Sequence, residues 1–273
     1  MRILVTNDDG IDSVGLHLLA RAMTKHGDVT VVAPDSEYSG ASAAFGALHL
    51  IKPEVHKVHL EGVERVFTVS GPPALCVFLA RLGVFGEVPE LVVAGINPGA
   101  NVGRSVYHSG TIGAALTGRN GGIPGVAFSQ EVSNFGVEGQ GWEDALEGQL
   151  WDTAVAVADT VVSALVQKLP GDAAVLNVNV PNVPLDQIKG WRYAEIGVVP
   201  PRTVANAYLE PRPGHEDAYW AIMQYGEKTS LPEHLDGGTV GAGYVALSWL
   251  SRLEHEPRSD HKIDAALDGL LGR

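Results

Sequence analysis

The sequence predicts an α/β protein with a mainly parallel sheet and helices on both faces. Short β-branched runs alternate with helical patterns through the first two-thirds of the chain, an order that favours parallel strands joined by helical crossovers. The opening unit shows this most clearly, because an apolar run at 2–6 precedes a helical stripe from Leu16 to Met23 and a second run at 29–33. A strand, a helix and a strand within about 35 residues predict a right-handed parallel crossover.

The later elements continue this alternation. The first strand ends at the turn sequence Asn7-Asp8-Asp9-Gly10, and Gly27 is a plausible stop for the first helix. Further strands are expected at 65–69, 91–94, 124–129, 173–180 and 244–249. Further helices are expected at 73–82, 110–119, 143–169 and 264–271. Between residues 65 and 180, a predicted helix therefore separates each predicted strand from the next, as in layered α/β folds.

The composition and the hydrophobic pattern change after Pro181, where prolines cluster and the periodic patterns weaken. The 273 residues fit one structural domain, which we divide into a catalytic core at 1–182 and an extension at 183–273. The extension is expected to bury its scattered large side chains on the core or on partner subunits. These side chains are Trp191, Tyr208, Trp220, Tyr225, Tyr244 and Trp249.

Composition excludes several classes of protein. The net charge of −13 argues against sequence-independent nucleic-acid binding, which needs a basic surface. No stretch approaches the roughly 20 apolar residues of a membrane helix. The single cysteine, Cys76, cannot form an intramolecular disulfide or a multi-cysteine metal site, and its apolar helical surroundings predict a core residue rather than a nucleophile. We therefore expect a cytoplasmic protein with neither a nucleic-acid nor a membrane partner.

Polar residues follow three of the predicted strands, at the carboxyl ends where parallel sheets bind ligands. Asp8 and Asp9 follow the first strand, Ser39 follows the second, and Asn97 follows the strand at 91–94. The adjacent carboxylates would repel each other unless a cation lay between them. Four oxygen donors without a thiol or imidazole suit Mg²⁺, Mn²⁺ or Ca²⁺ rather than zinc. We expect one divalent ion, Mg²⁺ or Mn²⁺, at an exposed turn, although Asn-Asp-Asp-Gly is also ordinary turn and N-cap material.

A second group of residues predicts an anion site. Asn101 and the run His108-Ser109-Gly110-Thr111 precede a helix whose N-terminal N–H groups could bind a phosphate. Ser109 or Thr111 would serve equally well as a plain helix cap, and His108 is a candidate substrate contact because it lies beside the site. A metal on one side and a helix N-terminus on the other would clamp a phosphoryl group. A metal-activated water, or a water steered by Asp8 or Asp9, would then attack phosphorus.

Several motifs together give the chain a family resemblance. They lie at 3–11 (ILVTNDDGI), 31–35 (VVAPD), 39–42 (SGAS), 95–97 (GIN), 99–101 (GAN), 109–111 (SGT) and 176–181 (LNVNVP). Each motif is weak alone, but their order and spacing are specific. The chain resembles the SurE (survival protein E) family of metal-dependent 5′/3′-nucleotidases.

The resemblance implies a three-layer α/β/α, Rossmann-like core and the hydrolysis of nucleoside 5′- and 3′-monophosphates. It implies that Asp8, Asp9, Ser39 and Asn97 hold the metal. It implies a phosphate pocket that is built from Asn101 and the run Ser109-Gly110-Thr111. It also implies a cytoplasmic homodimer or homotetramer that assembles through C-terminal elements.

Alternative functions remain open at this point. The segments 71–76 (GPPALC) and 243–250 (GYVALSWL) depart from the family pattern, so the same chemistry could act on another small phosphate ester, such as a biosynthetic intermediate. A non-catalytic nucleotide-binding protein is a second alternative, although a binder does not need paired carboxylates beside a phosphate. A dinucleotide-dependent oxidoreductase is least favoured, because no G-x-G-x-x-G follows the first strand.

Overall fold

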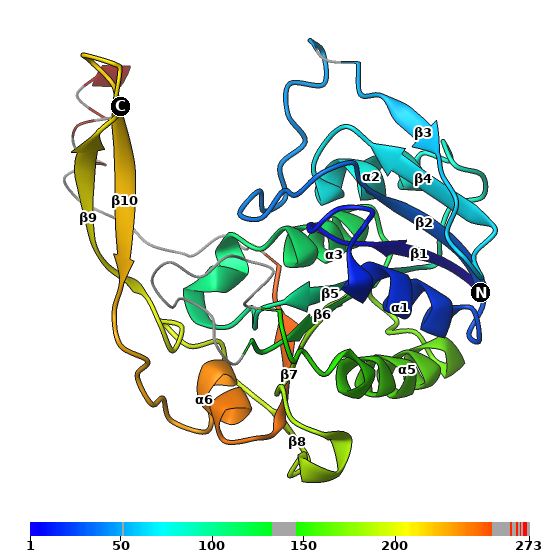
Figure 1. Ribbon diagram of the computed structural model, residues 1–273. Coiled ribbons are helices and arrows are strands. Elements are labelled where there is room, and N and C mark those ends of the chain that lie inside the picture. The colour runs from blue at the N-terminus through cyan, green and yellow to red at the C-terminus, as the bar shows by residue number, and fades with distance from the viewer. Residues whose placement is uncertain are drawn as a thin grey trace.

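The centre of the molecule is a nine-stranded sheet in the order β3-β4-β2-β1-β5-β6-β7-β11-β8 (Figure 1). The computed structural model describes residues 1–50, 52–132 and 146–252, together with residues 263, 266, 268, 270 and 271. The strands of the large sheet are β1 (Arg2–Thr6), β2 (Asp28–Pro34), β3 (Val55–Lys57), β4 (Arg65–Val69), β5 (Leu91–Pro98), β6 (Gly125–Gln130), β7 (Val175–Val180), β8 (Trp191–Tyr193) and β11 (Val245–Leu250). The α-helices are α1 (Val14–Met23), α2 (Pro73–Arg81), α3 (Gly110–Asn120), α5 (Trp151–Gln167) and α6 (Asp236–Gly241).

The sheet is mainly parallel, as the sequence predicts. Its central strands β4, β2, β1, β5, β6 and β7 run parallel to their neighbours, whereas β3 and β11 pair with β4 and β7 in the antiparallel sense. The chain passes from β1 to β2 on one side and later reaches β5 on the other side of β1. The strand order therefore reverses between β1 and β5. Such a switch point is where open α/β sheets bind their ligands, at the carboxyl ends of the strands.

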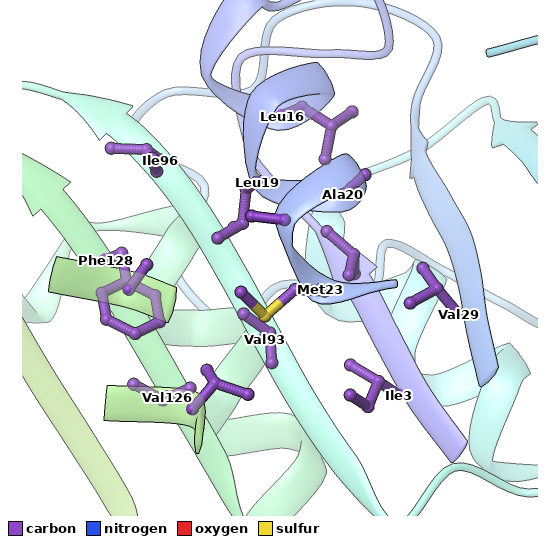
Figure 2. Packing of buried hydrophobic residues seen from close by; sticks show 14 of the residues in the cluster. Ile3, Leu16, Leu19, Ala20, Met23, Val29, Val93, Ile96, Val126 and Phe128 are labelled. Atoms are coloured by element: carbon purple, nitrogen blue, oxygen red, sulfur yellow. The ribbon is translucent and has the colours of Figure 1, made fainter. Parts of the chain in front are cut away.

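Helices cover both faces of the sheet and complete the three predicted layers. Helices α1 and α5 pack on one face, and α2 and α3 pack on the other. Figure 2 shows Leu19 and Met23 of α1 among the strand residues Ile3, Val93 and Phe128. All five side chains are almost completely buried. The apolar stripe of α1 therefore fixes that helix, and the β1–α1 loop before it, on the sheet.

Several elements of the structure differ from the prediction. The long helix α5 begins at Trp151, because Gly148 adopts a positive φ of 78° and residues 146–150 form a turn and an extended link. The first residues of the predicted helix, 143–145, lie outside the described residues. The short edge strand β3 was not predicted, and it is exposed along its length. The helix expected at 264–271 lies largely outside the described residues.

The segment after residue 183 rejoins the sheet rather than forming a separate layer. Strand β11 pairs with β7, and β8 pairs with β11 at the edge. Between them, β9 (Val204–Pro211) and β10 (Tyr219–Tyr225) form an antiparallel hairpin that stands away from the rest of the chain (Figure 1). Within the described residues, no helix is both long and apolar enough to cross a membrane.

Candidate metal and phosphate site

The loops after β1, β2 and β5 meet the N-terminus of α3 around a cavity of ≈ 400 Å³. This brings together most of the residues predicted from the sequence. The predicted residues on its wall are Asp8, Ser39, Asn97, Asn101, His108 and Ser109. The six other wall residues, which include the polar side chains of Glu37 and Ser105, were not singled out from the sequence. The remaining three predicted residues, Asp9, Gly110 and Thr111, lie beside or behind Asp8.

Asp8 lies in a buried position and not, as the sequence suggested, in an exposed turn. Its side chain is 3% exposed, and one carboxylate oxygen accepts a hydrogen bond from the Thr111 hydroxyl. The backbone N–H groups of Gly110 and Thr111 also donate to this carboxylate. A Cβ at position 110 would lie 2.8 Å from Asp8 Oδ2, so only glycine permits this approach. The expectation was wrong because the N-terminus of α3 packs directly on the turn. Helix α3 begins only at Gly110, far from Asp8 in the sequence.

Asp9 supplies the observation that best fits a cation. It is half-buried, and its Oδ2 has no hydrogen-bond partner in the described part of the chain. Burial raises the pKa of Asp9 to about 8, and the nearby carboxylates of Asp8 and Glu37 add to this effect. Burial also raises the pKa of Asp8, against the lowering effect of its hydrogen bonds. Two adjacent carboxylates that are both costly to ionise match the charge of a divalent cation.

The remaining metal oxygens would have to come from neutral groups. Among the residues that the structure describes, no group of three or more His, Cys, Asp or Glu side chains is placed to hold an ion. Asn97 donates its Nδ2 to the carbonyl of Gly99 at 2.7 Å, so its amide oxygen is the atom available to a metal. A register irregularity between Ala94 and Asn97 in β5 re-aims this side chain at the end of the strand. Ser39 is exposed on the cavity wall and can add a hydroxyl oxygen. This donor set suits a hard divalent cation.

The helix N-terminus has a more complex role than the sequence suggested. Ser109 caps α3, because its hydroxyl accepts a hydrogen bond from Ile112 N at 3.1 Å. Thr111 is fully buried, and its hydroxyl donates to Asp8. His108 is exposed, and its carbonyl accepts a hydrogen bond from Ser42 N at 3.1 Å, which ties the loop after β2 to this segment. Part of the donor capacity of α3 is therefore used to hold Asp8, and phosphate binding by these residues stays a prediction.

Asn101 is held by residues that the sequence analysis did not assign to the site. Asn179 of β7 accepts from Asn101 N at 2.8 Å and donates to the carbonyl of Asn101 at 3.1 Å. Asn177 donates to the same carbonyl at 2.9 Å, and Asn101 Nδ2 donates to Ser129 at 2.9 Å. The sequence does carry a signal, since two asparagines alternate with apolar residues in the fully buried strand VLNVNV. Buried amides in a strand need partners, which here belong to a cavity loop.

Comparisons with known proteins find one family. The family described as Survival protein SurE matches residues 3–201 of the chain. A 5′/3′-nucleotidase SurE from Erwinia tasmaniensis is 37% identical over 92% of the chain and 90% of the relative. A 5′-nucleotidase SurE from Mannheimia succiniciproducens is 36% identical over 91% of each. The crystal structure of a SurE protein from Aquifex aeolicus superposes with a TM-score of 0.72 and 28% identity, covering 99% of this chain and 100% of that one.

The paired carboxylates generate a first prediction, which concerns the variant Asp9→Asn. In EDTA at neutral pH this variant should melt at a higher temperature than the wild type, because it removes a carboxyl group that burial and the nearby Asp8 make costly to ionise. Mg²⁺ or Mn²⁺ at 100 times the dissociation constant of the wild type should stabilise the wild type by about 2.7 kcal/mol. The same concentration should hardly stabilise the variant. Thermal unfolding with and without metal measures both effects. An equal metal-dependent shift in the two proteins would show that Asp9 is not a ligand.

A second prediction compares Asn179→Ala with Asn177→Ala. Loss of Asn179 leaves the buried N–H of Asn101 unpaired and should lower the free energy of unfolding by about 1–3 kcal/mol beyond the cost of the lost volume. Loss of Asn177 should cost less, because Asn179 still serves the Asn101 carbonyl and Asn177 Oδ1 already lacks a partner in the described chain. Urea unfolding ranks the two variants. The clamp assignment is wrong if Asn177→Ala is the more damaging change.

Proposed function

Because this chain belongs to the SurE family, we propose that it is a metal-dependent phosphomonoesterase that hydrolyses nucleoside 5′- and 3′-monophosphates to nucleoside and phosphate. The observation that carries this proposal is the adjacent carboxylates of Asp8, which is buried, and Asp9, which is half-buried, beside the N-terminus of α3. A pair of this kind can hold a divalent cation, which in turn can neutralise the charge of a phosphate. Its position at the strand-order switch between β1 and β5 is where such a sheet binds ligands.

The proposed metal ligands are Asp8, Asp9, Ser39 and Asn97, with Mg²⁺ or Mn²⁺ as the ion and Ca²⁺ as an oxygen-preferring substitute in crystals. A bound divalent ion would neutralise phosphate charge and lower the pKa of a coordinated water. The hydrogen bonds from Gly110 and Thr111 hold Asp8 in one orientation. Asp9, whose Oδ2 has no such bond, would hold the ion through this oxygen.

The phosphate is proposed to lie between these ligands and the residues Asn101, His108, Ser109, Gly110 and Thr111. Asn179 hydrogen-bonds both the backbone N–H and the carbonyl of Asn101. Asn101 can therefore orient an oxygen of the substrate without a large rearrangement of its loop. The exposed ring of His108 lines the same cavity and can donate to a phosphate oxygen. The positive end of α3 favours the negative charge that shifts between the phosphate oxygens during transfer.

A third prediction tests the activity. Phosphate release from AMP, GMP, CMP and UMP should be lost in EDTA and restored by Mg²⁺ or Mn²⁺. Asp8→Asn should lower kcat/KM by about 100-fold or more, whereas the exposed Asp172→Asn, a matched control, should leave kcat/KM unchanged.

The same screen separates the alternative functions. Faster release from non-nucleotide phosphate esters would favour a redirected phosphatase, although the relatives named as nucleotidases do not favour this reading. Nucleotide binding without phosphate release at any metal concentration would instead mean a non-catalytic binding protein.

We also propose that the protein is a cytoplasmic homodimer or homotetramer. The β9–β10 hairpin supports this, because it is exposed along nearly its whole length and carries large apolar side chains. Those at least 45% exposed include Tyr208, Leu209, Tyr219, Trp220 and Met223. An exposed apolar arm is a common device for association between copies of one chain.

The proposed cytoplasmic location is supported by the single cysteine, Cys76, which is free and buried and suits a reducing compartment.

A fourth prediction concerns this hairpin. Sedimentation at micromolar concentration should give a dimer or a tetramer for the wild type, and the double variant Leu209→Glu/Trp220→Glu should shift the protein toward smaller species. The double variant Glu216→Gln/Asp217→Asn at the hairpin turn is a matched control and should keep the wild-type assembly. A wild type that sediments only as a monomer would contradict the proposal.

A further inference from the structure

A short 3₁₀ helix, η1 (Gly103–Tyr107), forms part of one wall of the phosphate cavity. It places Ser105 on that wall and leads directly into His108 and Ser109, which line the same cavity. Before η1, the strand β7 fixes Asn101, and after η1, Ser109 caps helix α3. Both ends of this segment are therefore held, and the position of η1 between them decides where the side chains of Ser105 and His108 lie.

The start of η1 is capped from the C-terminal part of the chain. The free N–H groups at the start of a helix need acceptors, and the N-cap residue of η1 is Val102, whose side chain cannot accept a hydrogen bond. Oδ2 of Asp236, the first residue of α6, accepts from Gly103 N at 2.8 Å instead. Oδ1 of Asp236 accepts from Gly197 N at 3.0 Å and from Gly237 N at 2.8 Å. One completely buried carboxylate thus joins η1, α6 and the segment around residue 197.

Close packing accompanies this hydrogen bond. Gly103 adopts a positive φ of 58°, and a Cβ at this position would lie 2.6 Å from the carbonyl carbon of Val199. The neighbouring side chain of Val102 is buried in one apolar cluster with Val240 of α6. Apolar contacts tolerate small shifts, whereas a hydrogen bond requires a certain distance and angle. Asp236 therefore supplies the directional part of the contact between η1 and the C-terminal part.

We infer that Asp236 is a positioning residue for the phosphate side of the proposed active site. The inference rests on the function proposed above. Asp236 is not among the wall residues of the phosphate cavity, so it acts through η1, which carries Ser105 and leads into His108. The proposed metal ligands all precede Asn101, on the other side of the point that β7 fixes. The bond from Asp236 to η1 should therefore control the affinity for phosphate and leave the affinity for the metal unchanged.

The variant Asp236→Asn tests this assignment at almost constant volume. An asparagine has a single acceptor oxygen, so a side chain that still serves Gly197 and Gly237 turns its NH₂ group toward Gly103 N. Inorganic phosphate should then bind about tenfold or more weakly in the presence of Mg²⁺, and kcat/KM for AMP should fall by a similar factor. The dissociation constant for Mg²⁺ alone should stay unchanged. Calorimetric titration measures both dissociation constants.

The matched control is Thr239→Val, which removes a buried hydrogen bond from the same helix without touching η1. Thr239 is completely buried, and its hydroxyl donates to the carbonyl of Glu233 at 2.7 Å. Both variants should lower Tm, but only Asp236→Asn should weaken the binding of phosphate. An equal loss of phosphate affinity in the two variants would show that Asp236 acts only through general stability, and would overturn the inference.

The variant Gly103→Ala attacks the same link from its other side. Its added Cβ would press on the backbone of Val199 and displace η1 while Asp236 stays intact. It should weaken phosphate binding as Asp236→Asn does, and it carries the test if Asp236→Asn does not fold. The double variant should bind phosphate about as weakly as the weaker single variant, because both changes break one link. Independent losses that multiply in the double variant would contradict the inference.

Phosphate binding gives a readout that does not require hydrolysis. A wild type that binds phosphate but releases none from nucleotides would refute the proposed function, and weaker phosphate binding by Asp236→Asn and Gly103→Ala would still support the positioning role. Phosphate binding and hydrolysis of AMP that both stay unchanged in these variants would refute the positioning role and leave the proposed function intact. A wild type that neither binds phosphate nor hydrolyses AMP would overturn both.

Discussion

The burial of two adjacent carboxylates at the end of β1 is the constraint on which the site depends. Desolvation raises the pKa of both Asp8 and Asp9, and the negative charge of Asp8 makes Asp9 still harder to ionise. The fold compensates for one of the two. Helix α3 brings two backbone N–H groups and the Thr111 hydroxyl to Asp8, whereas Asp9 keeps an oxygen without a partner in the described chain. The divalent cation proposed here would balance the negative charge that the helix leaves uncompensated.

Close backbone packing makes this compensation possible. Gly110 allows α3 to approach Asp8, and a Cβ at Gly113 would lie only 2.1 Å from the carbonyl of Ser42, so the loop after β2 also rests on this helix. On the other side of the cavity, the asparagines of β7 fix the peptide of Asn101. The polar groups of the site are thus held by a helix and a strand. Catalytic groups that are fixed before the substrate arrives need little reorganisation during the reaction.

The C-terminal part of the chain contributes to the site although it brings none of the proposed metal ligands. Strands β8 and β11 extend the sheet, and Asp236 ties α6 to Gly103 beside the phosphate cavity. This arrangement divides the work between two regions. The loops of the first 111 residues carry the proposed chemistry, whereas residues 200–240 supply half of the wall of a smaller cavity of ≈ 250 Å³ beside the site.

The sequence by itself determined the α/β class, the parallel sheet and the strand ends at which ligands gather, because hydrophobic periodicity and turn residues are local signals. It also brought Asp8, Ser39, Asn97 and Asn101 to one edge through the general geometry of parallel sheets. Only the tertiary structure decided that Asp8 is buried, that Asn179 holds Asn101 and that Asp236 joins the C-terminal part to Gly103. These contacts link residues 103, 78 and 133 positions apart, and no local pattern records which distant groups will meet. Burial, and with it the electrostatic demand for a cation, follows from such contacts and therefore appears only in the folded chain.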